Sequence, residues 1–280
     1  MHESPARRPT THARVHVVEH GDARPQPDRL VTEEPMEIRV AGPGRPPVPV
    51  AVTMRTPGSD FELAVGFCVS ERVVGHPADV ATVAYCLRGD GPQEYNVVTV
   101  TTRSPIDVDA HRRAFVSNAS CGLCGKTTLD QVESECPPVA SRAVVTPAAL
   151  TTMPDRLRVG QDVFAATGAV HAAGCFSADG ELVVLREDVG RHNALDKVIG
   201  WATLGGHLPL AASVLLVSGR VSFEIVQKAA VAGIPVIGAV SAPSSLAVQA
   251  AERLGVTVVG FLRGHRFNVY SHAERIAGVA

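Results

Sequence analysis

The spacing of hydrophobic residues divides the chain into two parts of different character. In the first part, alternating and β-branched runs predict strands, and a polar start at Ser59 opens a segment with helical spacing. A later pair of strands flanks a turn that contains glycine. The predicted elements are strands at residues 14–18, 36–40 and 48–54, a helix at 59–74, and paired strands at 80–87 and 95–102. We therefore expect a small α+β domain over residues 25–116.

The second part alternates between helices and short apolar strands. The turn Ala178-Asp-Gly180 predicts a hairpin, and strand–helix units follow it. The predicted helices are 147–168, 193–201, 223–231 and 245–254, and the predicted strands are 170–176, 181–185, 213–217, 235–240 and 256–260. Such alternation is typical of an α/β protein whose mostly parallel sheet is flanked by helices. We expect this domain over residues 136–280.

The first 24 residues are rich in Pro, Arg, His and Thr and lack an apolar stretch, so we interpret residues 1–24 as a disordered tail. One uncharged stretch, residues 229–251, has the length of a membrane span. Its prolines, Pro235 and Pro243, favour a helix, a strand, a loop and a second helix instead. We expect a cytoplasmic protein that has no membrane partner.

Composition narrows the class of protein further. A chain of 280 residues with 45% hydrophobic and 19% charged residues can form one large or two moderate globular domains. The net charge of −2 and the aromatic content of 4% favour neither a basic surface nor a base-stacking platform, so we expect no nucleic-acid partner.

Four polar segments follow predicted strands of the second domain. If those strands are parallel, the segments lie along one edge of the sheet, where open α/β sheets bind ligands. Arg220, Arg263 and Arg266 can each bind phosphate oxygens with two hydrogen bonds, and Ser244 begins a helix whose free amides favour an anion. One such loop alone is an ordinary surface loop, but convergence predicts a pocket for a nucleotide-like anion. The four segments, called the rim below, are residues 186–193, 218–220, 241–245 and 261–266.

No P-loop or dinucleotide-binding glycine motif is present, so ATP and NAD are not supported as ligands.

Several single residues are explained by structural roles without a ligand. His171 has the setting of a buried strand histidine, and Asp188 and His192 flank a glycine where they can cap or line a turn. Cys68, Cys86 and Cys175 are expected in the core.

Two thiols, Cys121 and Cys124, lie three positions apart in a polar segment, with Lys126 two residues further on. A thiol reacts as its thiolate, and a nearby cation or a helix N-terminus lowers its pKa. Residues 127–133 have helical spacing, so both features are expected here. We predict a site of sulfur chemistry on a mobile loop and following helix at residues 117–135.

Three other interpretations of the Cys121–Cys124 pair fit the sequence less well. A structural zinc site needs two more ligands at similar spacing, and the other cysteines are scattered singly. A structural disulfide suits a secreted protein better than this chain. A thioredoxin-type redox pair is usually found where an early strand meets its helix, whereas Cys121 and Cys124 lie near the middle of the chain. We expect no permanent metal.

In several motifs the chain resembles the formate dehydrogenase accessory sulfurtransferase family, FdhD. The longest matching segment, Glu187-Asp-Val-Gly-Arg-His-Asn-Ala-Leu-Asp-Lys197, is too long for a chance match. The other matching segments are residues 120–126, 167–173, 218–220, 241–245 and 261–270, which run in order through most of the chain.

The resemblance implies a protein that takes sulfur from a cysteine desulfurase and passes it to a molybdenum or tungsten bis-guanine-dinucleotide pterin cofactor, which formate dehydrogenase then receives. It implies a homodimer, a cytidine-deaminase-like C-terminal domain, and a persulfide on Cys121. Cys124 can resolve that persulfide, shield it or be dispensable. GDP or GMP is expected to be a partial mimic of this cofactor. The resemblance and the rim together give the expected cofactor-binding residues, which are Phe261, Leu262, Arg263, Gly264, His265, Arg266, His192, Asn193, Ser218, Arg220 and Ser244.

Deamination itself is excluded by the residues. Zinc deaminases need a His-x-Glu motif, and His171 is followed by two alanines. Two further hypotheses stay open beside sulfur transfer: a chaperone that only delivers the cofactor, and a dithiol oxidoreductase that uses Cys121 and Cys124.

Overall fold

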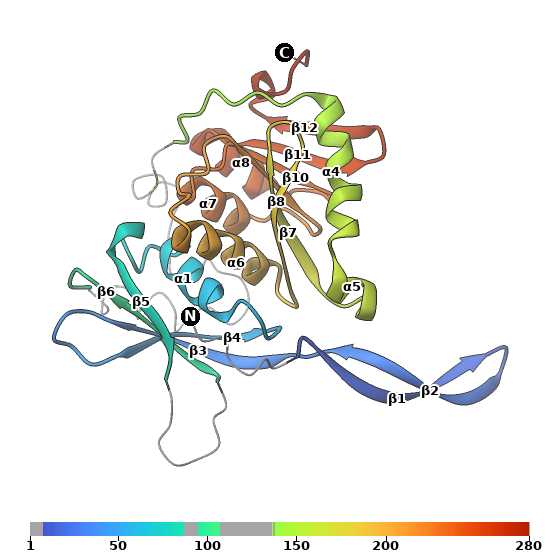
Figure 1. Ribbon diagram of the computed structural model, residues 1–280. Helices are drawn as coiled ribbons and strands as arrows, with labels where there is room; N and C mark the ends of the chain where they lie inside the picture. Colours follow the sequence, from blue (N-terminus) through green and yellow to red (C-terminus); the bar gives the residue numbers. More distant parts are fainter. Residues whose placement is uncertain (1–7, 87–94, 107–135, 137, 280) are drawn as a thin grey trace.

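The computed structural model describes residues 8–86, 95–106, 136 and 138–279, and the strands in this part of the chain form three sheets (Figure 1). The predicted loop and helix at residues 117–135, with Cys121 and Cys124, lie outside the described residues.

A two-stranded ribbon stands at the start of the described chain. Strands β1 (Thr10–Glu19) and β2 (Asp22–Val31) are antiparallel, and the ribbon projects from the body (Figure 1). His20 and Gly21 form its two-residue turn, both with positive φ (53° and 96°), which suits a tight hairpin. The prediction of a disordered tail is therefore wrong for residues 10–24. The β-branched alternation in β1 and a turn that matches the strand twist outweigh the polar composition.

The second sheet contains the predicted α+β elements. Its strand order is β4-β3-β6-β5, with β3 parallel to β6 and the other pairs antiparallel. Helix α1 packs beside it. The bounds are β3 Glu34–Ala41, β4 Val48–Arg55, α1 Asp60–Ser70, the short 3-10 helix η1 Pro77–Asp79, β5 Val80–Tyr85 and β6 Val97–Thr102.

The third sheet has the order β12-β11-β10-β9-β7-β8. Strands β9, β10 and β11 are parallel, and β7 runs antiparallel to both β8 and β9. Strand β8 therefore points the same way as β9, β10 and β11, which confirms the mostly parallel α/β prediction and the predicted hairpin. The strand bounds are β7 His171–Ser177, β8 Leu182–Asp188, β9 Ser213–Val217, β10 Val236–Ala239, β11 Thr257–Arg263 and β12 Arg266–Ser271.

Helices cover both faces of this sheet. Figure 1 shows α6, α7 and α8 side by side on one face and α4 on the other. Successive strand residues point to opposite faces, so Leu215 packs under the first group and Leu216 under α4. The bounds are α4 Pro147–Val159, α5 Asp162–Thr167, α6 Arg191–Leu204, α7 Phe223–Val231, α8 Ser245–Leu254 and the 3-10 helix η2 Ala273–Arg275.

The two predicted domains share one hydrophobic core. Buried residues of the second sheet and α1, such as Ile38 and Leu63, belong to the same cluster as Ile199 of α6 and Ile237 of β10. Helices α1 and α6 pack directly against each other (Figure 1). The described residues of the predicted domain at 25–116 are therefore not a separately packed unit. In the part of the chain that the structure describes, no helix has both the length and the apolar character to cross a membrane.

Candidate functional site

The predicted rim exists in the structure. Strands β8, β9, β10 and β11 all end at one edge of the third sheet, as their shared direction requires. Strand β7 runs the other way, so its first residue, His171, lies at this same edge, paired with Asp188 at the end of β8. The rim is thus built from four strand ends and one strand start.

Backbone hydrogen bonds join neighbouring segments of the rim. The amide of Ser218 donates to Ala172 O (3.0 Å), and the Ser218 hydroxyl accepts from the Ala172 amide (2.9 Å). The amide of Val221 donates to Ala242 O (3.2 Å) in the next segment. The adjoining strand continues the series, because the amide of Phe261 donates to Ser241 O (3.0 Å). Segments far apart in sequence therefore form one surface.

The segment 261–266 is the hairpin that joins β11 to β12. Phe261 has a positive φ of 52° and a side chain that is 41% exposed. Arg263, His265 and Arg266 are also exposed, and Gly264 supplies the left-handed conformation (φ 53°) of the tight turn. Arg263 is held by a hydrogen bond from Nε to Val240 O (3.0 Å). The hairpin therefore presents an aromatic ring, a histidine and two guanidinium groups to solvent.

Leu262 requires a correction. Its side chain is fully buried and belongs to the core beneath α4, with residues such as Leu216 and Val259. It can offer only backbone atoms to a ligand. The irregularity of β11 between Gly260 and Arg263, where Phe261 has a positive φ, turns the Leu262 side chain to the same face as Val259.

Asn193 requires a second correction. It is buried, and its side-chain nitrogen donates to Met54 O (2.8 Å) and to Asp188 Oδ1 (3.0 Å), while its oxygen accepts from Thr53 Oγ1 (3.2 Å). The side chain is occupied by the contact between the second sheet and the rim, so it is not available to bind a cofactor.

The same contact contains a buried ion pair. Lys197 Nζ lies 2.8 Å from Asp188 Oδ2, and both side chains are almost fully buried. The pair is bound to the chain just after β4, since the Thr56 amide donates to Asp188 Oδ2 (3.1 Å) and Lys197 donates to Thr56 O (2.9 Å). The motif 187–197 thus fixes the start of α6 against the second sheet.

His192 and Ser244 lie on the rim as predicted, each with local partners. His192 Nε2 lies 2.8 Å from Glu224 Oε2 and 3.2 Å from Ser222 Oγ. The hydrogen bond from His192 lowers the pKa of Glu224 below its ordinary value. The Ser244 hydroxyl caps α8 by accepting from the Ala247 amide (3.2 Å). Ser218 is partly exposed and Arg220 is exposed.

Two residues at the rim were not among the expected site residues, although Arg191 lies in the predicted segment 186–193 and His171 was interpreted as a buried strand histidine. Arg191 is the first residue of α6, and His171 begins β7. A Cβ atom on Gly219 would lie 3.3 Å from His171 Nδ1 and 3.9 Å from Arg191 Cδ, so the two side chains flank the same glycine. Burial and the nearby charges of Arg191 and His192 lower the pKa of His171. The position of Arg191 directly after a glycine and a strand was the sequence signal that could have identified it.

The described cysteines differ in environment. Cys68, Cys136 and Cys175 are buried, and burial raises the pKa of both Cys68 and Cys175. Cys86 is exposed, so the prediction that it lies in the core is wrong; it follows β5 where the chain leaves the sheet. Raised thiol pKa values oppose thiolate formation. Among the described residues, no group of three or more His, Cys, Asp or Glu side chains is placed to hold a metal.

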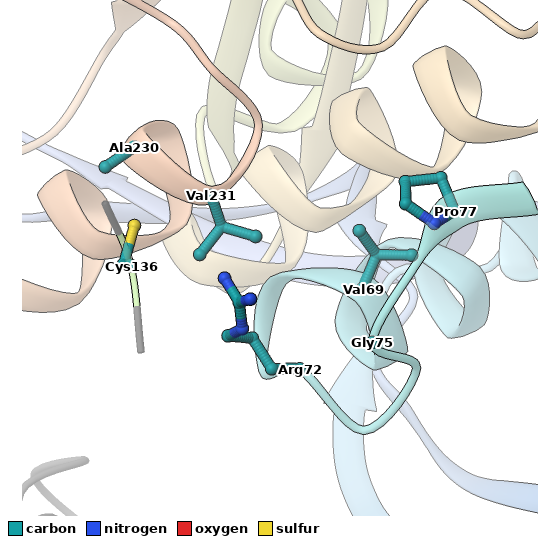
Figure 2. A pocket seen from close by; sticks show the side chains of 7 residues that line it. All are labelled: Val69, Arg72, Gly75, Pro77, Cys136, Ala230 and Val231. Carbon is teal, nitrogen blue, oxygen red and sulfur yellow. The ribbon is translucent and has the colours of Figure 1, made fainter. Parts of the chain in front are cut away.

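A small cavity of about 230 Å³ lies away from the rim. It adjoins the end of α1 and the last turn of α7, whereas α7 begins at the rim. Figure 2 shows the Arg72 side chain pointing toward Val231, with Cys136 near Ala230. The lining residues are Val69, Arg72, Gly75, Pro77, Cys136, Ala230 and Val231.

Comparison with known proteins identifies relatives over nearly the whole chain. A Mycobacterium tuberculosis protein named sulfur carrier protein FdhD is 52% identical over 277 residues, covering 95% of this chain and 98% of the relative. A Streptomyces coelicolor protein of the same name is 50% identical over 282 residues, covering 96% of each chain.

A solved structure shares the fold. The crystal structure of a proposed formate dehydrogenase accessory protein from Desulfotalea psychrophila matches with a TM-score of 0.74 and 24% identity, covering 95% of this chain and 99% of that one. The model of the FdhD/NarQ family matches residues 31–277, so the resemblance carried by the motifs is confirmed and this chain belongs to the FdhD/NarQ family.

Proposed function

We propose that this protein is a sulfur carrier. It takes sulfur from a cysteine desulfurase as a persulfide on Cys121 and transfers it to a molybdenum or tungsten bis-guanine-dinucleotide cofactor, which formate dehydrogenase requires. The observation that carries the proposal is the name sulfur carrier protein FdhD on relatives about half identical over nearly the full chain. In this proposal the protein works as a homodimer.

The loading step is an exchange between two sulfur atoms. The Cys121 thiolate attacks the outer sulfur of the persulfide on the donor enzyme, the donor's S–S bond breaks, and the donor's cysteine leaves as a thiolate. One S–S bond is lost and one is formed, so no external oxidant or reductant is needed. The described cysteines with raised pKa values are poor candidates for this role, which supports the assignment to the polar segment of Cys121.

The rim supports binding of the acceptor. Its exposed guanidinium groups can form charge-assisted hydrogen bonds with phosphate oxygens. The exposed ring of Phe261 offers a surface on which a guanine base can stack. These groups stand on strand ends joined by hydrogen bonds, which holds them in place before a ligand arrives. The arginines concerned are Arg220, Arg263 and Arg266.

Mass spectrometry of the intact protein tests the loading step. After incubation with a cysteine desulfurase and cysteine, we expect the wild type to gain mass in steps of one sulfur atom. Cys121→Ala should not gain it, whereas Cys86→Ala, which removes an exposed thiol elsewhere, should gain it as the wild type does. Equal gain in Cys121→Ala would exclude Cys121 as the carrier.

Complementation of a strain that lacks the protein separates the alternatives. A sulfur carrier needs Cys121 for formate dehydrogenase activity, whereas a chaperone that only delivers the cofactor restores activity in Cys121→Ala. A dithiol oxidoreductase needs both Cys121 and Cys124 and reduces a disulfide substrate in vitro.

A further inference from the structure

Arg191 has an unsatisfied buried donor. Its Nε atom is the single buried side-chain nitrogen or oxygen without a hydrogen-bond partner among residues 8–86, 95–106, 136 and 138–279. Leaving such a donor unsatisfied destabilises the folded protein. A guanidinium group is always charged and has five donors in a planar fork, so an oxygen-rich anion is its natural partner.

Two carboxylates near the start of α6 are already engaged. Asp188 pairs with Lys197 at 2.8 Å, and Glu224 pairs with His192 at 2.8 Å. Arg191 itself forms no salt bridge within the part of the chain that the structure describes. Among the described residues, Arg191 is therefore a cation at the rim without a salt-bridge partner, although its charge acts on the nearby Glu224.

The surroundings of Arg191 suit a small oxyanion. Gly219 lies beside both Arg191 and His171, so the lack of a side chain there leaves space next to them, and both residues are partly exposed. The lowered pKa of His171, caused first by burial, keeps its ring neutral near pH 7, so it can donate one hydrogen bond.

The backbone at the start of α6 also favours the binding of an anion. Arg191 starts a 14-residue helix whose N-cap residue, Gly190, has no side chain to cap the first turn. The first hydrogen bond of the helix runs from the Ala194 amide to Gly190 O (3.0 Å), so the amides before Ala194 remain to face a ligand. The positive end of the helix dipole adds to the attraction of an anion.

We propose that Arg191, His171 and the first turn of α6 form a second phosphoryl-binding subsite on the rim. The proposal rests on the proposed function in one respect, because it places the subsite beside the hairpin 261–266 expected to bind guanylate. In the strand order β11-β10-β9-β7, three spacings of about 4.8 Å separate β11, which carries the hairpin, from β7, which carries His171. The two subsites therefore lie about 14 Å apart. Two anion subsites at this separation suit a ligand with a phosphate group at each end.

Calorimetric titration with inorganic pyrophosphate tests the subsite. We expect two sites per chain in the wild type and one in Arg191→Ala, while Arg266→Ala loses the other. The matched control is Arg142→Ala, which removes an exposed arginine whose neighbour Ser141 bonds to Ala211 before the start of β9, at the opposite edge of the sheet. The control should keep both sites.

Arg191→Lys keeps the positive charge but lacks the Nε donor, and we expect it to weaken the second site about tenfold or more. If Arg191→Ala does not fold, the binding of pyrophosphate to Arg191→Lys alone tests the subsite. Unchanged binding in Arg191→Lys and Arg191→Ala, or no pyrophosphate binding by the wild type, overturns the subsite.

Titration with GDP separates this proposal from the proposed function. If GDP binds no more tightly than pyrophosphate and guanosine does not compete, guanylate recognition fails while the Arg191 subsite stands. If GDP binds tightly and pyrophosphate binding is the same in wild type and Arg191→Ala, the subsite fails while guanylate recognition stands.

Discussion

Gly66 of α1 lies directly against the backbone carbonyl of Asp196 in α6. A Cβ atom at Gly66 would overlap that carbonyl oxygen and lie 2.6 Å from its carbon. Gly200 of α6 faces Glu62 of α1 in the same manner, with a Cβ atom 2.7 Å from the Glu62 α-carbon. The two helices touch through their backbones, which joins the second and third sheets across a shared core.

Gly66→Ala should therefore be strongly destabilising. The added methyl group meets backbone atoms, which cannot move aside as a flexible side chain can, so we expect the free energy of unfolding to fall by about 3 kcal/mol or more. Urea denaturation followed by circular dichroism measures the change. Gly75→Ala is the control, because its Cβ atom would have no neighbour within 4 Å. Equal stability of the two variants would contradict the packing.

Lys228→Met should break a buried charge network. Lys228 Nζ lies 2.9 Å from Asp196 Oδ1 and 2.8 Å from Glu71 Oε1. Burial opposes the charge, but these carboxylates raise the pKa of Lys228 above its ordinary value, so the lysine stays protonated. Removing it leaves Asp196 buried without its cation, which should cost about 3–5 kcal/mol.

Thermal and urea unfolding of Lys228→Met measure that cost. The double variant Lys228→Met with Asp196→Leu removes both charges and should recover part of the loss. A double variant no more stable than the single one would show that the network is not the source of the effect.

The stability of the protein should depend on the protonation of His171. Its pKa is lowered in the folded state, so the unfolded chain binds more protons once the pH falls below about 6.5. The free energy of unfolding should therefore decrease as the pH drops from 7 through this window, and His171→Gln should reduce the slope. Urea denaturation between about pH 7 and 5 checks this. The exposed His265→Gln serves as control, and an unchanged slope in His171→Gln would refute the assignment.

Arg266→Ala and Leu262→Ala lie in the same hairpin, but the first should weaken ligand binding and the second should lower stability. Arg266 is exposed, so its loss should weaken GDP binding about tenfold to a hundredfold and leave stability nearly unchanged. Leu262 is fully buried, so its truncation should lower the free energy of unfolding by about 2–5 kcal/mol. Calorimetry with GDP and urea denaturation of both variants distinguish the roles; a reversal of either effect would contradict them.

Local pattern was sufficient for much of the fold. The strand–helix alternation after residue 170 predicted the sheet, and the direction of its strands predicted which segments share the rim. Leu262 could not be placed in this way, because strict alternation in β11 puts it on the face opposite Val259, whereas the irregularity at Phe261 turns it to the same face. The expectation that the whole segment 261–266 binds the cofactor is therefore wrong for the Leu262 side chain.

Other features depend on contacts that no local pattern contains. The backbone contact of Gly66 with Asp196 joins helices far apart in the chain, so local pattern alone predicts two domains where the structure has one shared core. Asn193 looked like a ligand residue until Met54 and Thr53 were seen to occupy its amide. Arg191 was missed because an unsatisfied donor is a property of three-dimensional surroundings.

The reversed direction of β7 has a consequence for how relatives can diverge. Strands β8, β9 and β10 each reach the rim through a loop that also starts a crossover helix, so a change there alters a connection of the fold. Strand β7 arrives from the short exposed connector at Gly168 and Ala169, which begins no helix. Insertions in that connector offer a route by which ligand preference can evolve while every crossover stays intact.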